Sequence, residues 1–373
     1  MTAIALGASP DEDRVLVTVF LRGGADGIAL VAPVHDDAYH RARPRLGLPA
    51  SRALPLAGVF GLAPELSELH PWFLAGQLAV VHAVGSDDDS RSHFVAQEVM
   101  ERGGAAGSGG WLGRWLRARG RAGALTAVAT GPAVPDSLRG APSATALAGL
   151  RELAPGPGWS GLCASLAGLY RRDPQLAGPA RDALAAAERV ARLRADGLRP
   201  EHGARYPTAT DGEAALAFGR HLAEVAALIR ARVGLTAACV DLPGWDSHFA
   251  QETIVAPQMR ALALGLSAFA TDLGPALART SVVVMSEFGR RVAENASLGT
   301  DHGRGGVMFV LGGGTPGGMH CRWPGLDDDR LDGPGDLPVV HDYREVLAAV
   351  LQRHGQADPH LTFPGYTPAP LPV

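Results

Sequence analysis

Short runs of valine, leucine and alanine recur along this chain, and most of them end in a cluster of polar residues and glycines. Runs that are apolar on both faces are typical of parallel strands that helices cover on both sides. Segments of helical character lie between the runs, which favours a parallel sheet. We therefore predict an α/β fold in which helices flank a doubly wound, mostly parallel sheet. The predicted strands lie at residues 14–21, 78–84, 125–130, 235–242, 281–285 and 307–314.

The length of the chain is compatible with one large folding unit. It has 373 residues, of which 46% are hydrophobic and 19% charged, so a sizeable core can form. We predict a single domain over residues 1–373. It contains a helical insertion at about residues 174–231, which a polar loop interrupts at 202–212, and a closing helix at 341–351.

The composition excludes several classes of partner. The net charge is −4 and both signs are spread evenly, which predicts no nucleic-acid-binding surface and no basic patch for a membrane. No apolar run reaches the roughly 20 residues that a membrane span needs. The N-terminal segment lacks the apolar core of a signal peptide, so we expect a cytoplasmic protein. Cys163, Cys239 and Cys321 lie far apart without a CxxC pair, which argues against a disulfide framework or a thiolate zinc site.

Residues that can bind a metal follow several of the predicted strands. In sheets of this kind, ligands bind outside the carboxyl ends of the strands, so these residues are expected to meet at one edge. Imidazole and carboxylate groups suit zinc, manganese or iron, and carboxylate-rich sites suit magnesium or calcium. We therefore predict one or two divalent metal ions as the cofactor. The candidate ligands are Asp26, Asp246, His248, Glu287, Asp301 and His302.

Glu287 is the most informative of these candidates. It follows an apolar strand at a position that should be nearly buried, and a buried carboxylate must be paired or bound to a cation. Arg290 or Arg291 could supply a structural salt bridge, so both interpretations stay open. For Asp246 and His248 the alternative is an ordinary turn in which the aspartate caps the next helix.

A segment rich in serine lies where the second predicted strand leads into a helix. Ser92 has the amides of the helix N-terminus beside it, and could be a nucleophile activated by a metal or an ordinary N-cap residue. Arg304 is a fixed cation that can hold a phosphate or sulfate through two hydrogen bonds. The catalytic candidates are Arg91, Ser92, His93 and Arg304.

Six motifs, taken in order, carry a resemblance to a known family. They are FLRGGADG, SRSHF, GWDSH, VVVMSEFGR, GTDHGRGG and DYREVL. Together they resemble the bacterial family called domain of unknown function 1501, or DUF1501, which is grouped with the alkaline phosphatase and sulfatase superfamily. The resemblance runs from about residue 14 to residue 367.

The superfamily resemblance implies an alkaline-phosphatase-like, doubly wound sheet with a two-metal site. Asp26 would bind one metal, and Asp246 and His248 would bind the other, although this last pair is spaced more closely than the usual Asp-x-x-x-His. Ser92 would be the nucleophile, with Ser90 as the second match.

Two alignments of the later ligands compete. One equates Asp301 and His302 with the Asp-His pair of the superfamily. The other places Glu287 at that aspartate and makes His302 the lone later histidine, and we prefer it because no predicted strand precedes Asp301. It leaves Phe288 where a histidine ligand is expected, so His93 or Asp301 would complete the site.

The ligands and the resemblance together predict a metal-dependent hydrolase or transferase that acts on a phosphate or sulfate ester. The substrate would be a small anionic molecule held by Arg91 or Arg304, and Ser92 or water activated at the metal would attack it. One alternative is a metalloenzyme of another reaction class, oxidative or isomerising, because a fold does not fix a function. The other is a non-catalytic binding protein that the metal stabilises. Family members often carry a twin-arginine export signal, and its absence here also favours the cytoplasm.

Overall fold

The structure is a computed structural model that describes residues 14–104, 107–120, 123–150, 159–173, 176–195, 198–356 and 358–371. The N-terminal segment for which the sequence predicts no signal peptide lies almost entirely outside these residues. Cys239 and Cys321 are free thiols, and the side chain of Cys163 lies outside the described part of the chain.

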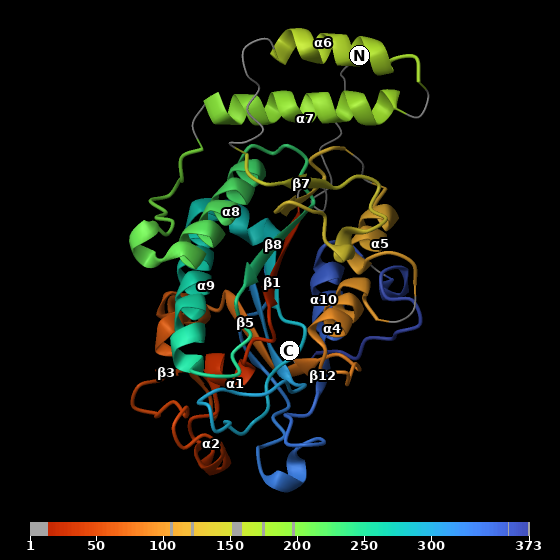
Figure 1. The fold of residues 1–373 in the computed structure, drawn as a ribbon. Helices are drawn as coiled ribbons and strands as arrows, with labels where there is room; N and C mark the ends of the chain where they lie inside the picture. Colours follow the sequence, from red (N-terminus) through yellow and green to blue (C-terminus); the bar gives the residue numbers. More distant parts are fainter. Residues whose placement is uncertain are drawn as a thin grey trace, which may run out of the picture.

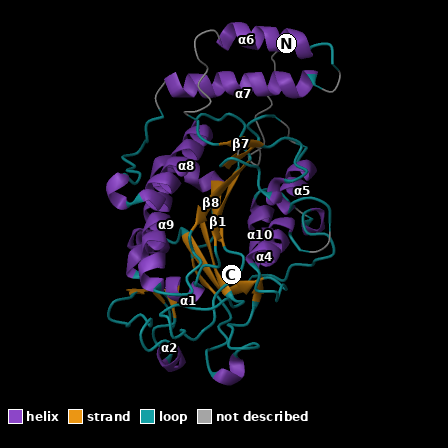
Figure 2. Cartoon of the chain, in the orientation of Figure 1, coloured by secondary structure: helices purple, strands orange, loops and turns teal. Residues whose placement is uncertain are grey.

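A mixed, mostly parallel sheet of nine strands runs through the middle of the protein, with helices on both faces (Figures 1 and 2). Its order is β11-β5-β10-β9-β1-β8-β6-β7, and β12 pairs with β5. The strand β10 is antiparallel to both of its neighbours, and all other pairs are parallel. The strands are β1 (Val15–Arg22), β5 (Leu78–Gly85), β6 (Ala127–Thr130), β7 (Thr145–Leu147), β8 (Ala237–Pro243), β9 (Thr280–Met285), β10 (Gly306–Gly312), β11 (Gly318–His320) and β12 (His341–Asp342).

All six predicted strands are present, which confirms the α/β class. The short strands β7, β11 and β12 were not predicted, because two or three residues leave no apolar run to detect. The closing helix α10 (Tyr343–Arg353) starts two residues later than predicted, because His341 and Asp342 first pair with β5. The side chain of Asp342 caps this helix by accepting a hydrogen bond from the Arg344 amide.

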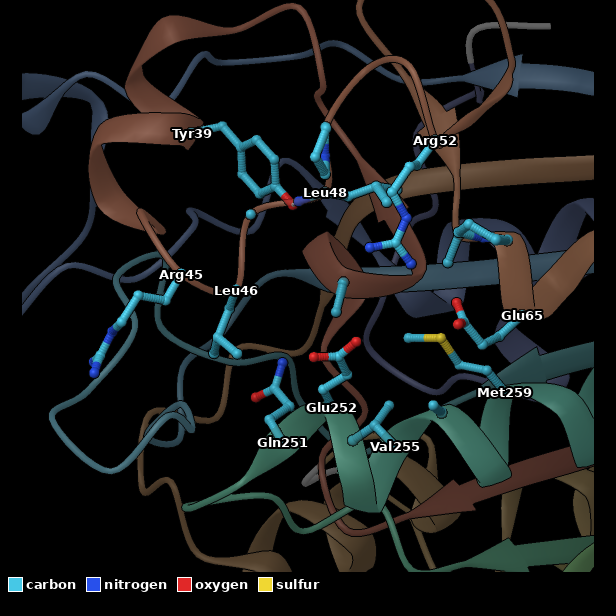
Figure 3. Close-up of a pocket in the computed structure, with 16 residues that line it drawn as sticks. Tyr39, Arg45, Leu46, Leu48, Arg52, Glu65, Gln251, Glu252, Val255 and Met259 are labelled. Atoms are coloured by element: carbon cyan, nitrogen blue, oxygen red, sulfur yellow. The ribbon is translucent and has the colours of Figure 1, made fainter.

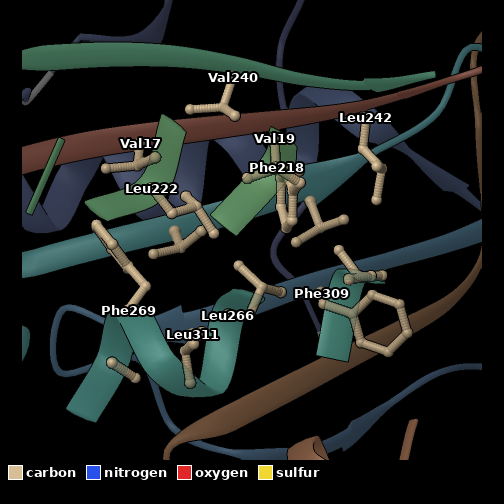
Figure 4. Packing of buried hydrophobic residues seen from close by; sticks show 14 of the residues in the cluster. Val17, Val19, Phe218, Leu222, Val240, Leu242, Leu266, Phe269, Phe309 and Leu311 are labelled. Carbon is tan, nitrogen blue, oxygen red and sulfur yellow. The ribbon is translucent and has the colours of Figure 1, made fainter. Parts of the chain in front are cut away.

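The alternation of side chains along β1 builds a core on each face of the sheet. Val17 and Val19 pack toward α8 (Glu213–Arg230) and α9 (Gln251–Leu273). Phe218 and Leu222 of α8 belong to the same cluster (Figure 4). Leu16 belongs to the cluster on the other face, which includes residues of α4 (His93–Arg102), α5 (Trp111–Ala118) and α10. Burial on both faces explains why the strand sequence is apolar throughout.

The predicted helical insertion divides into two parts. The helix α8 belongs to the layer that covers the sheet, because its apolar stripe is buried against α9. The helix α7 (Ala177–Ala195) lies beyond the end of the sheet (Figure 1), beside α6 (Trp159–Tyr170), which precedes the predicted bounds, and Val190 of α7 reaches the core.

Smaller elements surround this framework. A three-stranded sheet has the order β2-β4-β3. Its strands and the neighbouring short helices are α1 (Gly27–Leu30), β2 (Val31–Ala32), α2 (Asp37–Ala42), β3 (Leu54–Pro55), β4 (Gly61–Leu62) and α3 (His70–Leu74). The 3-10 turns are η1 (Pro64–Leu69), η2 (Asp136–Leu138), η3 (Ala209–Asp211), η4 (Gly274–Arg279), η5 (Asp328–Arg330) and η6 (Pro359–Leu361).

One helical stretch, Gln251–Arg279, is long and apolar enough to cross a membrane by length and composition alone. Of the most apolar 18-residue window in this stretch, 61% is buried inside the protein. It contains α9, which packs on the sheet, so it has the character of the core helix of a soluble α/β protein.

The direction of β10 concentrates the polar clusters at one edge of the sheet. The strands β1, β5, β8 and β9 are parallel to one another in the sheet, so their carboxyl ends lie at the same edge. Because β10 runs the opposite way, the loop that precedes it also reaches this edge. The site described next is built at this edge.

Candidate metal centre

Four side chains converge at the carboxyl edge of the sheet: His93, Asp246, His248 and His302. The Nε2 atoms of His248 and His302 are 2.9 Å apart. Asp246 Oδ1 lies 3.1 Å from Nε2 of His248 and 3.5 Å from Nε2 of His302, and its Oδ2 lies 3.5 Å from Nε2 of His93. We call these four residues the metal centre.

Three different connections of the sheet supply the metal centre. His93 is the first residue of α4, which follows β5. Asp246 and His248 come directly after β8. His302 lies in the loop before β10, where its backbone forms an isolated bridge with Arg290 in the loop after β9. The sequence predicted this meeting of strand ends from the parallel sheet.

His93 is oriented by Glu287. The Nδ1 atom of His93 lies 2.8 Å from Oε1 of Glu287, whose side chain is fully buried. Since a carboxylate accepts, Nδ1 is the protonated nitrogen and Nε2 carries the lone pair. That Nε2 atom is buried and has no hydrogen-bond partner in the protein. A buried lone pair without a donor is costly, so a cation at this point would satisfy it.

His302 is held in the same way, and His248 has a longer contact. Nδ1 of His302 donates to the carbonyl oxygen of Arg91 at 2.8 Å, and Nδ1 of His248 lies 3.6 Å from Oδ1 of Asp301. Burial and the nearby charges of Arg290 and the other histidines lower the pKa of His302, which favours its neutral form. The lone pair on Nε2 of His302 therefore lies 2.9 Å from Nε2 of His248, a separation at which both nitrogens can bind one cation.

The spacing of these atoms fits metal coordination. Ligand atoms bound at about 2.1 Å lie about 3.0 Å apart in octahedral geometry and about 3.4 Å apart in tetrahedral geometry. The contacts among the four residues measure 2.9 to 3.5 Å. Histidines that bind a metal through one nitrogen commonly donate the other to a carboxylate or a carbonyl, as His93 and His302 do here.

Asp246 is fixed by Arg290. The guanidinium of Arg290 is buried and donates to Oδ1 of Asp246 at 2.6 Å, and also to the carbonyl oxygens of Gly23, Gly24 and Thr300. Burial alone would raise the pKa of Asp246, but the hydrogen bond and charge of Arg290 hold it below its ordinary value. Asp246 is therefore an anion at neutral pH.

The glycine turn after β1 allows this close packing. Gly23 and Gly24 have φ of 120° and 65°, in the region that favours glycine. A Cβ on Gly23 would lie 2.5 Å from the amide nitrogen of Asp246, and one on Gly24 would lie 2.4 Å from the ring of Phe288. The turn predicted from the sequence is thus needed for the approach of β1 to the loops after β8 and β9.

Glu287 does not lie among the converging atoms. Its Oε1 accepts hydrogen bonds from His93, from Gln97 Nε2 and from the Gly23 amide, and its Oε2 accepts one from Ser286. Burial raises the pKa of this carboxyl, but these hydrogen bonds outweigh burial and hold it below the ordinary value. The structure therefore places Glu287 behind His93, where it positions the imidazole, and the described contacts show no salt bridge to Arg290 or Arg291, the alternative that the sequence left open.

Asp26 also has other partners. Its two oxygens receive hydrogen bonds from Arg43 at 2.7 and 3.1 Å, from Gln251 at 2.6 Å, and from the amides of Ile28 and Ala29. Asp26 and Arg43 are both fully buried. The carboxylate caps α1 and neutralises a buried arginine, so no oxygen is left for the predicted metal. The residue sits where the resemblance expects a ligand, but this chain supplies Arg43 as the cation.

The two arginines expected to hold an anion are paired with carboxylates. Arg91 donates twice to Oδ2 of the buried Asp336, at 3.0 and 2.6 Å. Arg304 donates to Asp332 at 3.1 Å. Arg91 contributes instead through its carbonyl, which holds His302, and its φ of 52° marks a strained backbone at this point.

Ser92 is the N-cap residue of α4 and lies directly before His93. Its side chain makes no capping hydrogen bond, so its hydroxyl is not occupied in the way that an ordinary N-cap serine would be. Ser90 is the less available of the two serines, because its hydroxyl donates to Asp88 and accepts from the Ser92 amide.

Sequence reasoning assigned His93 a catalytic role and considered it only as one of two ways to complete the metal site. The structure brings it together with Asp246 and His302. Phe288 lies beside this group, with its ring centre 4.8 Å from those of His93 and His302. Asp301, the other residue considered, contacts His248 from outside. The role of Arg290 had no local signal beyond its position three residues after Glu287.

An open pocket of about 120 Å³ is lined in part by Gln251. It is formed by the segment after α2 and the first turns of α9, and Arg52 and Glu252 extend toward it (Figure 3). Gln251 separates this pocket from Ser247 and Thr300, whose hydroxyls both donate to its Oε1. No residue of the metal centre lines the pocket.

The four later motifs agree with a comparison against protein-family models. A model described as a protein of unknown function, DUF1501, matches residues 167–361, which is more than half of the chain. The chain belongs to the DUF1501 family. The matched part of this DUF1501 protein contains Asp246, His248 and His302, whereas His93 lies before it. A search of curated proteins found no match.

Proposed function

We propose that this DUF1501 protein is a metal-dependent enzyme that hydrolyses or transfers the acid group of a phosphate or sulfate ester. The observation that carries the proposal is the grouping of His93, Asp246 and His302, whose possible ligand atoms lie within 4.8 Å of one another, with Nε2 of His248 2.9 Å from Nε2 of His302. The ester class rests on the order of the sequence motifs, and the metal rests on the geometry.

The donor set favours one transition-metal ion. Three imidazoles and one carboxylate suit zinc, manganese or iron better than magnesium or calcium, which prefer oxygen ligands. The oxygens of Asp26 are occupied by Arg43, Gln251 and two amides, which leaves the second ion of a two-metal site without its expected ligand. Within the described residues, the cluster containing His93 is the single group of three or more histidine, cysteine or acidic side chains with metal-like spacing.

The chain's own residues would prepare the site for an ester. Glu287 and the Arg91 carbonyl fix the direction of two imidazoles, and Arg290 fixes Asp246. A bound divalent ion would supply positive charge against the charge that develops on the ester oxygens. Asp246 and His248 are roughly half-exposed, so an ester can approach from that side. The unoccupied hydroxyl of Ser92, next to His93, is our candidate for the attacking group.

We also propose that the fold is related to that of alkaline phosphatases and sulfatases. Two observations support this relation: the helix-covered, mostly parallel sheet, and the position of the metal centre at the carboxyl edge of its strands. The departures at Asp26 and Phe288 would then mark a branch that keeps one metal ion instead of two.

A redox metalloenzyme is the second candidate. The nitrogen-rich donor set and the aromatic ring of Phe288 packed beside His93 and His302 favour it, because iron sites commonly have imidazole and carboxylate ligands with positions left open. Redox-active iron together with no esterase activity would support this reading.

The test combines metal analysis with an ester screen. Protein purified without chelator is analysed by inductively coupled plasma mass spectrometry, and is then assayed with p-nitrophenyl phosphate and p-nitrophenyl sulfate after loading with zinc or manganese. We expect close to one ion per chain, lost in His302→Ala and kept in His35→Ala, an exposed histidine outside the metal centre. Ser92→Ala should keep the metal and lose turnover. Absence of bound metal in the wild type, even after loading, would refute the proposal.

A further inference from the structure

Large apolar side chains stand exposed beside the metal centre. Phe94, which follows His93, is 89% exposed, and Phe249, which follows His248, is 63% exposed. Two phenylalanines in such positions are unusual, since exposing an aromatic ring to water costs free energy unless something covers it. Each follows directly, in the sequence, a histidine of the metal centre.

The backbone brings a third apolar side chain to the same place. The amide of Gln251 donates to the carbonyl of Leu298 at 2.7 Å, and the amide of Ala250 donates to the carbonyl of Ser297 at 3.0 Å. These bonds tie the loop containing Leu298 to the segment that follows Phe249. The Leu298 side chain is exposed, and its φ of 58° places it in the left-handed region. We call Phe94, Phe249 and Leu298 the apolar rim.

Helix geometry directs Phe94 toward the metal centre. Side chains in an α-helix lean toward the helix N-terminus. Phe94 is the second residue of α4, and the N-terminus of α4 is the end that carries His93. The opposite side of the helix, with Ala96 and Met100, is buried in the core, so Phe94 lies on the solvent side of α4 at the end that carries His93.

We propose that the apolar rim binds an aryl or similarly bulky apolar group of the substrate while the polar group of that substrate reaches the metal centre. The inference rests on the proposed metal-dependent function and names the substrate class for it. A ligand site of this kind combines apolar walls with a few polar groups that fix orientation. Asp246 and His248 are half-exposed and Phe249 follows His248 directly in the chain, so we expect one molecule to reach both the metal centre and Phe249.

Two small chelators of the same head group test the inference. Acetohydroxamic acid and benzohydroxamic acid differ only in carrying a methyl or a phenyl group. Their affinity for the zinc-loaded protein is measured by isothermal titration calorimetry. We expect benzohydroxamic acid to bind about tenfold more tightly, since burying a ring removes much apolar surface from water. In Phe94→Ser/Phe249→Ser this preference should fall to about twofold or less, with the affinity for acetohydroxamic acid unchanged.

The matched control is Leu74→Ser, which removes an exposed apolar side chain at the end of α3, outside the apolar rim. It should keep the full preference for the phenyl compound. Equal binding of both compounds to the wild type, or an unchanged preference in the double variant, would overturn the inference and leave the metal centre intact. Failure of both compounds to bind would overturn the metal centre itself, and the inference with it.

Sedimentation velocity separates this inference from its main rival, that a second copy of the chain covers the apolar rim. We expect the wild type and Phe94→Ser/Phe249→Ser to sediment alike at all concentrations. A wild-type dimer that dissociates in the double variant would assign the rim to self-association and refute the substrate role.

Discussion

Replacing Glu287 by glutamine should weaken metal binding through His93 without removing any proposed ligand. Oε1 of Glu287 lies 2.8 Å from Nδ1 of His93 and its side chain is 0% exposed, so water does not screen the interaction. Losing such a carboxylate behind a metal-binding histidine typically costs roughly 10- to 100-fold in affinity, or about 1.4 to 2.7 kcal/mol. Glutamine keeps the size and one acceptor oxygen for Gln97 and the Gly23 amide, so the local structure should persist.

Asp301→Asn is the matched comparison. Oδ1 of Asp301 lies 3.6 Å from Nδ1 of His248, which is beyond a good hydrogen bond, and its side chain is 47% exposed. Screening by water should limit the loss of affinity to about threefold or less. Both affinities are measured by competition with a chromophoric zinc chelator, and the thermal melting of the metal-free variants checks that they fold. A Glu287→Gln protein that binds zinc as tightly as the wild type, or an Asp301→Asn protein that loses more, would refute this account of the centre.

Three further outcomes follow from the same contacts. Asp26→Asn should lower the free energy of unfolding by about 3 to 5 kcal/mol in urea titrations, because Arg43 stays buried without its partner, yet the metal content should not change; loss of metal would restore Asp26 as a ligand. Burial lowers the pKa of His82 to about 4 and that of His354 to about 3. The unfolded chain therefore binds protons first, so stability is complete above about pH 6.5 and falls by roughly 2 kcal/mol per histidine by about pH 5. His354→Gln should flatten this slope in urea titrations across that range, and an unchanged slope would contradict the assignment. Chelation should lower the melting temperature of the wild type but not that of His302→Ala, since an ion that binds only the folded state stabilises it; equal effects on both proteins would place the ion elsewhere.

The histidines that converge at the edge of the sheet were easier to predict than the residues that hold them. His248 and His302 lie in polar clusters that follow or precede strong strand signals, and parallel strands bring such clusters together. The partner of His93 is Glu287, 194 positions further along the chain, and no periodicity relates the two. The sequence around a carboxylate at a strand end does not show whether the carboxylate binds a metal or orients a histidine.

Asp26 is a second residue whose partner the sequence does not indicate. Its motif matches the one expected of a metal ligand, and the structure buries its carboxylate. Arg43 sits in a loop after a short helix and nothing in its neighbourhood marks it as a buried cation. Only the path of the chain between them decides that the carboxylate meets a guanidinium and not an ion.

The sequence by itself determined the α/β class, the positions of the main strands and the edge where the polar residues gather. These are local properties. A strand buried on both faces must be apolar throughout, so polar residues follow its end. The tertiary structure decided which polar atoms meet. Because β10 is antiparallel to its neighbours, His302 in the loop before it lies at the same edge as His248, which follows β8. The distance of 2.9 Å between their Nε2 atoms depends on the packing of the whole sheet.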